Sequence, residues 1–515
     1  MGCITGSWFS IKLNGSVHGF FPGKSGIRQG DPLSPYLFVL SMEILSRYMR
    51  TICSQPQVSL HPKCSKIGLT HLVFADDLMI FILGDVPSIV AVAHTLTAFA
   101  AWSRLHANTD KTDVYFGGVQ QSVKNEILRD TGFSEGTFPF RYLGLPLNTA
   151  RNTVDMYGVL INKIQASVQH WSSTSLSYAG KIQLLNSVIF GLENFWCANA
   201  LLPHSILKLI NKICKNFFWT KDTVQRKMVM KSWASICSPK AEGEFNVKEL
   251  LSWNKALICK WLCILTHNPS SLWCSWNRAY NLSNCSIWDL ECKDRYSESF
   301  ISIISIKNDL ITKTGSPAAA SDLLHSWYIS GQFRVQHAYE WFRPKYPLLP
   351  WIKALTHHVV VPCHGLIASM ASQERLATTD HLIRRGMQIP NRCVLCKLAA
   401  ESHGHLFFHC SFSAVVWSRV LCWMNLPGRS CDFKIELVWC IHRGSRRHWK
   451  HSWFLSCLTI TVYSLWKERN RRIFSGHDCS TDQLVAIIKR LSTTALLSRP
   501  CLAARSIVVA ALHSL

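Results

Sequence analysis

Two adjacent carboxylates lie within an otherwise apolar stretch, His71 to Phe81, whose sequence is HLVFADDLMIF. Asp76 and Asp77 are flanked by short runs of bulky and β-branched residues, which predict a strand, a turn and a second strand rather than a helix. A tight hairpin explains the acids by itself, because aspartate favours turns. A divalent-metal site is the alternative, since paired carboxylates at a strand end supply the oxygen ligands that hard cations prefer.

A second chemically competent group is the stretch CVLCKLAAESHGHLFFHC, which offers Cys393, Cys396, His405 and Cys410. Three thiols and one imidazole at this spacing suit tetrahedral zinc. His403 and His409 compete with His405 for the histidine position. Four protein ligands leave no place for an activated water, so the predicted Zn²⁺ site is structural. The alternative is a set of unrelated free cysteines in a chain that contains 21 of them.

A third group is basic and aromatic, and it lies between residues 441 and 475. It contains eight cations and one acid, Glu468, and aromatic residues are interleaved with them. The cations are Arg443, Arg446, Arg447, Lys450, Lys467, Arg469, Arg471 and Arg472, and the aromatic residues include Trp449, Trp453, Trp466 and Phe474. Phosphate neutralisation combined with base stacking would make this a nucleic-acid-binding region. A solvated basic face above a tryptophan core is the alternative.

Length, net charge and the distribution of apolar residues limit the possible classes of protein. A chain of 515 residues predicts roughly three domains, each large enough for its own core. A net charge of +24 indicates a polyanionic partner, with RNA and DNA as the first candidates and a membrane surface as the second. Residues 452–466 are uncharged and largely apolar, but the run is short and contains several Ser and Thr, so it predicts a buried helix, with a membrane anchor as the alternative. The start of the chain has no signal-peptide pattern, so we expect a reducing intracellular compartment, cytoplasm and/or nucleus.

The elements that must position these residues give an α+β fold. Ser34 is expected to cap a helix that begins at Pro35, and a further helix is expected over residues 88–104. Residues 108–118 predict a turn leading into a strand, and residues 140–147 predict a short strand pair. Apolar spacings of three and four indicate helices from Tyr157 to about Leu265. Residues 268–331 are weakly patterned.

The motifs occur in an order that closely resembles the palm of reverse transcriptases from plant LINE-type (non-LTR) retrotransposons. The loop and helix GIRQGDPLSP come first, followed by FADD in the hairpin, Asn108 to Lys111, and YLGLPL. The resemblance continues through WSSTSLSYAGKIQLLNSVI, SPKAEGEF, WNKALICKW and GQFRVQHAYEWF, the zinc-binding reverse-transcriptase domain and LWKERNRRIF. It covers nearly the whole chain.

The resemblance implies a role for each matching residue. Arg28, Gln29 and Gly30 would line the pocket for the incoming nucleotide and the template. Asp76 and Asp77 would bind Mg²⁺ for two-metal nucleotidyl transfer. Lys111 would lie near the nucleotide phosphates, as a catalytic residue able to protonate the pyrophosphate. Tyr142, Leu143 and Gly144 would hold the primer end, and deoxynucleotides would be the only small-molecule substrates.

The resemblance also implies a division of the chain. The expected parts are a partial, truncated palm over 1–150, a helical thumb or connection over 151–275, a linker-like region over 276–330, the zinc-binding domain over 331–425 and a basic helical tail over 426–515. RNA-directed DNA polymerase is therefore the ancestral activity.

One required part of the polymerase site does not occur in the sequence. In this family a second carboxylate lies upstream of the Arg28 loop, and nothing acidic precedes Asp31. Asp31 follows the loop and cannot replace it. We therefore expect no polymerase activity from this chain alone. The alternatives are a zinc-containing nucleic-acid-binding protein derived from a retrotransposon, and a decaying open reading frame without a selected role.

Overall fold

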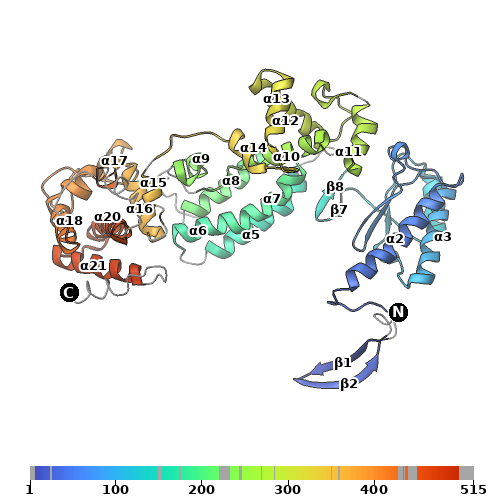
Figure 1. Cartoon of the computed structure of the whole chain (residues 1–515), viewed down its shortest axis with the longest axis horizontal. Coiled ribbons are helices and arrows are strands. Elements are labelled where there is room, and N and C mark those ends of the chain that lie inside the picture. The colour runs from blue at the N-terminus through green and yellow to red at the C-terminus, as the bar shows by residue number, and fades with distance from the viewer. Residues whose placement is uncertain are drawn as a thin grey trace. The chain divides into compact units, whose positions relative to one another are not determined.

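The computed structural model contains two compact units, which are described separately (Figure 1). The first unit comprises Met1–Asn152 and Trp261–His325, and the second comprises Thr153–Lys260 and Ser326–Leu515. The structure describes residues 6–23, 26–148, 154–172, 176–219, 232–242, 246–267, 270–283, 285–349, 351–355, 357, 360–426, 433, 435–438 and 449–497. Helices dominate these residues, and their strands form five two-stranded ladders, so the mixed α+β class is confirmed.

The first unit begins with an antiparallel hairpin and continues as helices interleaved with short ladders. Its strands are β1 (Trp8–Leu13), β2 (Ser16–Pro22), β3 (His71–Phe74), β4 (Asp77–Ile80), β5 (Asp113–Val114), β6 (Ser134–Glu135), β7 (Phe140–Tyr142) and β8 (Leu145–Leu147). Its helices before residue 150 are α2 (Ser34–Cys53), α3 (Val86–Ser103) and α4 (Gln121–Thr131). β5 and β6 pair in parallel, whereas the other ladders are antiparallel.

The core of this region joins α2 to α3. Leu45 and Met49 of α2 pack with Val92 and Phe99 of α3, and Leu78 of β4 packs against them. The predicted helices over this region are confirmed, with one correction at a cap. α2 begins at Ser34, and the Ser34 hydroxyl donates to the Arg28 carbonyl instead of capping the helix. That hydrogen bond ties the preceding loop to the first turn of α2.

Residues 276–330, expected to be linker-like, are folded for the most part. α11 (Leu272–Asn277), α12 (Glu298–Thr314) and α13 (Pro317–Ser326) occupy this part of the chain. Ser297 caps α12, and Phe300, Ile303 and Leu310 are buried along it. Ser297 thus begins a helix rather than an irregular segment. The five sequence ranges remain predictions as domain boundaries.

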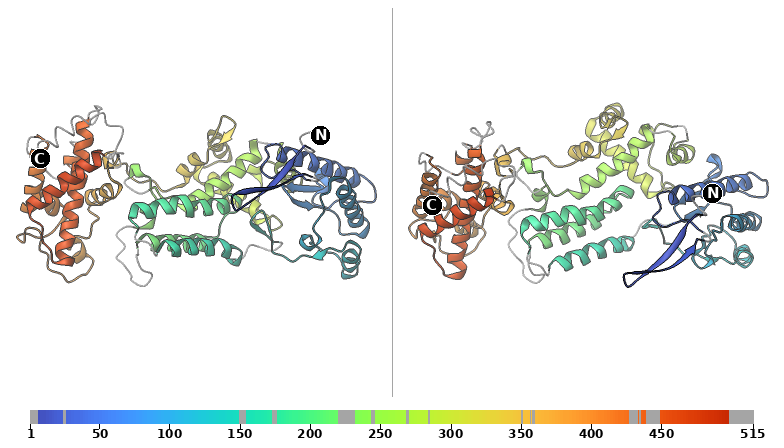
Figure 2. Two further views of the ribbon diagram at one scale, coloured as in Figure 1. Left: turned by 90° about the horizontal axis from the view of Figure 1, so that it is seen from below. Right: turned by 60° about the horizontal axis from the view of Figure 1, so that its bottom comes forward.

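The second unit is almost entirely helical. Its helices are α5 (Gly158–Ser172), α6 (Tyr178–Leu184), α7 (Phe190–Asn199), α8 (His204–Trp219), α9 (Trp233–Ile236), α14 (Val335–Phe342), α15 (Ile352–Leu355), α16 (Pro362–Ser372), α17 (Thr379–Arg384), α18 (Ser411–Trp423), α20 (Trp449–Ser475) and α21 (Thr481–Leu497). α10 (Leu250–His267) contributes residues to both units, and β9 (Tyr328–Ile329) pairs with β10 (Gln332–Phe333). The long α20 and the following α21 lie side by side (Figure 2).

The core of the C-terminal part crosses the boundary predicted at residue 425. One continuous cluster of buried side chains runs from Ile352 through Trp417 to Ile488. Leu455, Leu458 and other apolar residues of α20 are fully buried within it, which confirms the helix predicted over residues 452–466. α20 therefore belongs to the same core as the cysteine- and histidine-rich stretch.

One helix of the described residues, α3, has the length and composition of a membrane span. One third of that window is buried, and its buried residues include Val92 and Phe99 of the core described above. The core helix of a soluble protein can have the same length and composition. These two properties therefore do not distinguish a membrane span from a core helix at α3.

Candidate functional site

The predicted zinc ligands converge in the second unit. The Sγ atoms of Cys393, Cys396 and Cys410 and a ring nitrogen of His405 all lie within 4.8 Å of one another. The two measured edges are 3.9 Å from Cys393 Sγ to Cys410 Sγ and 3.3 Å from Cys396 Sγ to His405 Nε2. A tetrahedron with Zn–S bonds of about 2.3 Å has S···S edges of about 3.8 Å. The four residues therefore fit zinc, and no other group of three or more such residues occurs among the described parts.

Local structure explains how the four ligands meet. Cys393 N–H donates to the Ala399 carbonyl and Lys397 N–H donates to the Cys393 carbonyl, which closes the first loop on itself. Lys397 holds a positive φ of 59°, so the loop turns sharply there. His405 opens a single π-helical turn, His405–His409, and Cys410 precedes α18 directly.

The histidine that serves the metal can now be chosen. His403 is buried, and its Nε2 accepts from the Leu376 backbone N–H, while its Nδ1 lies 3.2 Å from the Thr378 hydroxyl. Both ring nitrogens are therefore committed to the fold. His409 is exposed and stands outside the cluster. Of the three histidines, His405 is the one whose ring nitrogen lies with the three thiols, so it fits the histidine position of a zinc site.

The electrostatics of Cys410 favour a thiolate. The Cys393 thiol donates a hydrogen bond to Cys410, and this is the main reason that the pKa of Cys410 is lowered. Backbone N–H groups of Ser413 and Phe412, at the start of α18, lower it further. Metal binding requires deprotonated thiols, so a helix N-terminus at Cys410 assists it.

The Asp-Asp hairpin is confirmed in the first unit. β3 and β4 pair from His71 with Ile80 to Phe74 with Asp77, and Ala75 takes a positive φ of 51° at the turn. His71 anchors the hairpin, because its Nε2 lies 3.0 Å from the Ser46 hydroxyl of α2. Asp76 and Asp77 are both exposed, and neither carboxylate has a hydrogen bond or ion pair among the described residues. Two carboxylates thus face solvent without a third acidic ligand in that part of the structure.

The other polymerase-type residues lie on exposed loops of the same unit. The Arg28 guanidinium stands 5.4 Å from the centre of the Phe9 ring, and Gln29 is exposed. Gly30 has a φ of 86°, and a Cβ there would meet nothing within 4 Å. The backbone conformation therefore favours glycine at this position.

Lys111 and the turn at residues 142–144 also lie at the surface of the first unit. Lys111 ends a short 3₁₀ turn, Thr109–Lys111, and its exposed side chain has no ion pair among the described residues. Tyr142 ends β7, and Leu143 and Gly144 join it to β8 with φ values of 51° and 84°. Two successive positive φ values define the tight hairpin turn that suits glycine at its second position. The strand pair predicted at residues 140–147 is confirmed.

The basic tail requires a correction. Arg469 and Arg472, predicted to contact phosphate, are buried with 4% and 7% of their side chains exposed. Arg469 forms a two-pronged ion pair with Glu401, and Arg472 pairs with Glu468. Arg471 is partly exposed but also pairs with Glu468. These internal partners occupy the guanidinium groups, and Arg446 and Arg447 lie outside the described residues.

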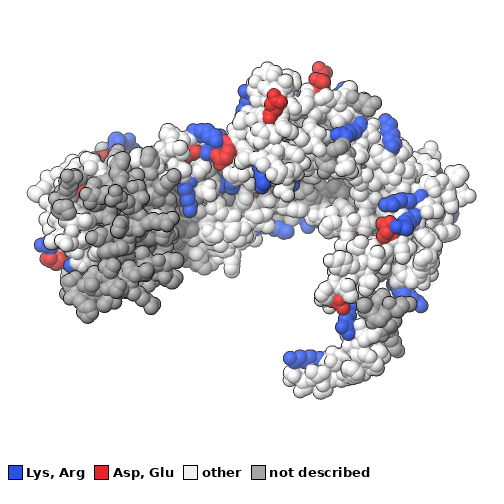
Figure 3. Space-filling view, in the orientation of Figure 1, with Lys and Arg blue, Asp and Glu red and all other residues white. Residues whose placement is uncertain are grey.

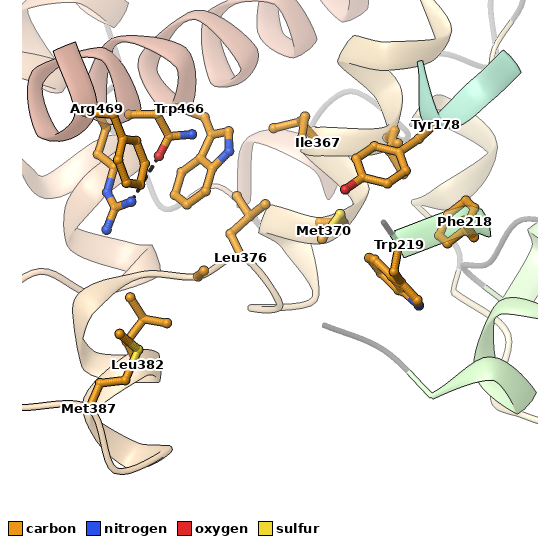
Figure 4. A pocket seen from close by; sticks show the side chains of 14 residues that line it. Tyr178, Phe218, Trp219, Ile367, Met370, Leu376, Leu382, Met387, Trp466 and Arg469 are labelled. Atoms are coloured by element: carbon orange, nitrogen blue, oxygen red, sulfur yellow. Dashed lines mark hydrogen bonds between the residues drawn. The ribbon is translucent and has the colours of Figure 1, made fainter. Parts of the chain in front are cut away.

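A cavity of about 430 Å³ lies beside this helix (Figure 4). Trp466 and Arg469 of α20 form one wall, and Tyr178, Phe218 and Trp219 face them from α6 and α8. The Arg469 guanidinium donates to Asn470 Oδ1 at the cavity edge. Because Glu401 neutralises Arg469, the cavity presents apolar and aromatic surface and no unpaired charge to a ligand.

Comparisons with known proteins agree with the two sites. Residues 2–147 match the family model of reverse transcriptase (RNA-dependent DNA polymerase), and residues 333–417 match the model described as zinc-binding in reverse transcriptase. These matches define the class: the chain carries a reverse-transcriptase segment followed by a zinc-binding segment of the kind found with it.

Relatives connect this class to retrotransposons. A retrovirus-related Pol polyprotein from the type-1 retrotransposable element R2 of Popillia japonica is 31% identical over 99 residues, which is 19% of this chain and 16% of the relative. A putative ribonuclease H protein of Arabidopsis thaliana is 30% identical over 129 residues, 25% of this chain and 21% of the relative. An uncharacterized mitochondrial protein of the same plant is 41% identical over 66 residues, 13% of this chain and 54% of the relative. The chain thus spans between about a sixth and about half of the length of these proteins. Its segments 2–147 and 333–417 are similar to a reverse transcriptase and to the zinc-binding segment found in reverse transcriptases.

Proposed function

We propose that this chain is part of the reverse transcriptase of a plant LINE-type (non-LTR) retrotransposon, that it binds RNA and DNA, and that it does not polymerise alone. The order of the two matched segments and the R2-element and Arabidopsis relatives support this assignment. In this proposal residues 1–150 are the palm segment, and the helices that follow serve as thumb and connection.

The exposed Asp76–Asp77 turn carries the proposal about activity. The two carboxylates are suited to Mg²⁺, which would be clamped between them and substrate phosphates. Two-metal transfer also needs carboxylate from a second strand, and no third acidic group joins Asp76 and Asp77 among the described residues. Arg28, Gln29, Gly30 and Lys111 would then contact a nucleotide without completing the reaction.

Primer extension tests this proposal. Purified chain is incubated with a primed RNA template, deoxynucleotides and Mg²⁺ or Mn²⁺, and we expect no extension. Asp76→Ala is the decisive variant, and Asp113→Ala, which alters another exposed acid of the same unit, is its matched control. Extension that survives Asp113→Ala but disappears in Asp76→Ala would contradict the proposal.

The nucleic-acid surface that we propose is α8 rather than the tail arginines. Lys208 and Lys212 are exposed on this helix and Lys215 is half-buried, whereas Ile206, Ile210 and other residues of its opposite face are buried. α8 contains no acidic residue, and basic side chains outnumber acidic ones on the face of the molecule shown in Figure 3. Lysines spaced four and three residues apart lie on one helical face and can follow a phosphate backbone.

Salt dependence of single-stranded RNA binding tests this surface. Each phosphate contact contributes about −0.7 to the slope of log affinity against log salt on single strands. Replacing Lys208, Lys212 and Lys215 together by glutamine should therefore flatten the slope by about 2. Lys467→Gln, which removes an exposed cation of α20, should change it by less than about 0.7. Equal slopes for the parent and the triple variant would exclude α8.

A zinc-containing nucleic-acid-binding role without catalysis is the second candidate. The closed geometry of the Cys393–Cys410 cluster favours it over a decaying reading frame, because four ligands from three segments still meet within 4.8 Å. The two candidate functions differ in one respect. In the first, the chain acts as part of a complete polymerase, and in the second it binds nucleic acid without taking part in polymerisation.

A further inference from the structure

We propose that Arg469 and Arg472 of α20 are positioning residues for the zinc centre, so that the zinc-binding unit includes α20. The matched zinc-binding segment ends at residue 417, and both arginines lie beyond it. The proposal concerns the hydrogen bonds that hold the ligand-bearing loops, and it adds no ligand to the metal.

Arg472 reaches the loops on both sides of the zinc ligands. One guanidinium nitrogen, Nη1, donates to the carbonyl of Leu395, which lies between Cys393 and Cys396, at 3.2 Å. The central carbon of the guanidinium lies over the Phe412 ring, 4.6 Å from its centre, two residues after Cys410. Glu468 orients the group by accepting from Nε at 2.8 Å. A single side chain therefore touches two of the three ligand-bearing segments.

Arg469 holds the third segment, which leads to His405. Its Nη2 and Nε donate to Glu401 Oε1 and Oε2 at 2.8 and 3.2 Å. The Glu401 side chain is fully buried, and Oε1 also accepts from the Thr379 backbone N–H at 2.8 Å. Glu401 lies between Cys396 and His405, so the ion pair fixes the loop that delivers the histidine.

The burial of these charges shows that they serve the fold. Glu401, Glu468, Arg469 and Arg472 all have 7% or less of their side chains exposed, and each is paired. Burying four charges is costly unless geometry and hydrogen bonding compensate for lost hydration. Here Arg472 donates to the Leu395 carbonyl and Arg469 donates to the Glu401 carboxylate, so each guanidinium has a hydrogen bond to a ligand-bearing loop. Groups that orient metal ligands typically change metal affinity by about 10- to 100-fold when they are removed.

Zinc affinity of the full-length chain, measured by competition with a chromophoric chelator, tests the proposal. Arg472→Gln should weaken zinc binding by about 10-fold or more. Arg471→Gln is the matched control, because Arg471 also pairs with Glu468 but contacts no ligand-bearing loop, and it should change affinity less than about twofold. Leu458→Ala serves as a second control, since it destabilises the same helix through a cavity and removes no hydrogen bond to the loops.

A spectroscopic readout separates positioning from general destabilisation. With Co²⁺ in place of zinc, the thiolate-to-metal bands should shift or lose intensity in Arg472→Gln and stay unchanged in Leu458→Ala. If Arg472→Gln does not fold, Arg472→Lys, which keeps the charge but not the fork of donors, should fold and show the weaker binding. Parent-like zinc affinity and Co²⁺ bands in folded Arg472→Gln or Arg472→Lys would overturn the proposal, whatever the outcome of primer extension.

Discussion

Glu193 of α7 offers a sharp test of the packing of the second unit. Glu193 is 3% exposed, and its Oε1 has no hydrogen-bond partner among the residues that the structure describes. Asn186, Asn211 and Cys214 line the adjoining void, which has room for about one water molecule. Burial raises the pKa of Glu193 from 4.5 to about 8, so the folded protein holds this carboxyl protonated at neutral pH.

The sign and size of the effect follow from proton linkage. The folded pKa lies above the unfolded one, so folding takes up a proton between about pH 4.5 and 8. The contribution of Glu193 to stability is complete below pH 4.5 and is lost progressively as the pH rises towards 8. At 1.36 kcal/mol per pKa unit, the loss is about 1 kcal/mol at pH 5 and about 3 kcal/mol at pH 7. Glu193→Gln, which stays neutral, should remove this loss.

Urea unfolding at pH 5, 6, 7 and 8 measures it, with hydrogen exchange of the α7 peptide as a local readout. We expect Glu193→Gln to be more stable than the parent by up to about 3 kcal/mol at pH 7, and the difference to shrink towards pH 5. Glu126→Gln, on the exposed face of α4, should leave the pH dependence unchanged. A parent and a Glu193→Gln variant whose stabilities change in parallel with pH would refute the reasoning.

Two further predictions concern a buried ion pair and a turn. Arg343→Met breaks the pair in which Arg343 Nη2 donates to Glu242 Oε1 at 2.6 Å, with both side chains at least nine-tenths buried. It should cost about 3–5 kcal/mol in urea unfolding, and adding Glu242→Met should recover part of that loss, since no unpaired charge then remains; a double variant no more stable than the single one would contradict this. Gly144→Ala should cost about 1 kcal/mol, because Gly144 has a φ of 84°. In Gly144→Ala we expect faster amide hydrogen exchange, confined to residues 140–147. Unchanged exchange in these residues would contradict the prediction that alanine strains the turn.

Local patterns predicted the elements that local forces determine. The hairpin at Asp76–Asp77 follows from two short apolar runs and a turn former, and both strands lie where the pattern places them. The zinc ligands were equally visible, since thiol spacing reflects loop geometry directly. At residues 276–330 the weak pattern was interpreted as linker-like, whereas α12 and α13 lie there and Ser297 caps α12.

Long-range pairing is what the sequence did not reveal. Arg469 meets Glu401 across 68 residues, and nothing local distinguishes it from the solvated arginines of a nucleic-acid-binding tail. Glu401 was missed for the same reason. The sequence did hold one clue: Glu468 is the single acid in a strongly basic stretch, and a lone acid among cations is better placed to pair internally than to face solvent.

Zinc content of the purified full-length chain tests the central claim most directly. The four ligand atoms already lie at tetrahedral spacing, so the parent should carry one zinc per chain. Cys393→Ser should lose it, whereas Cys422→Ser, which alters an exposed cysteine outside the cluster, should retain it. A parent chain without zinc, or a Cys393→Ser variant that keeps it, would contradict the account.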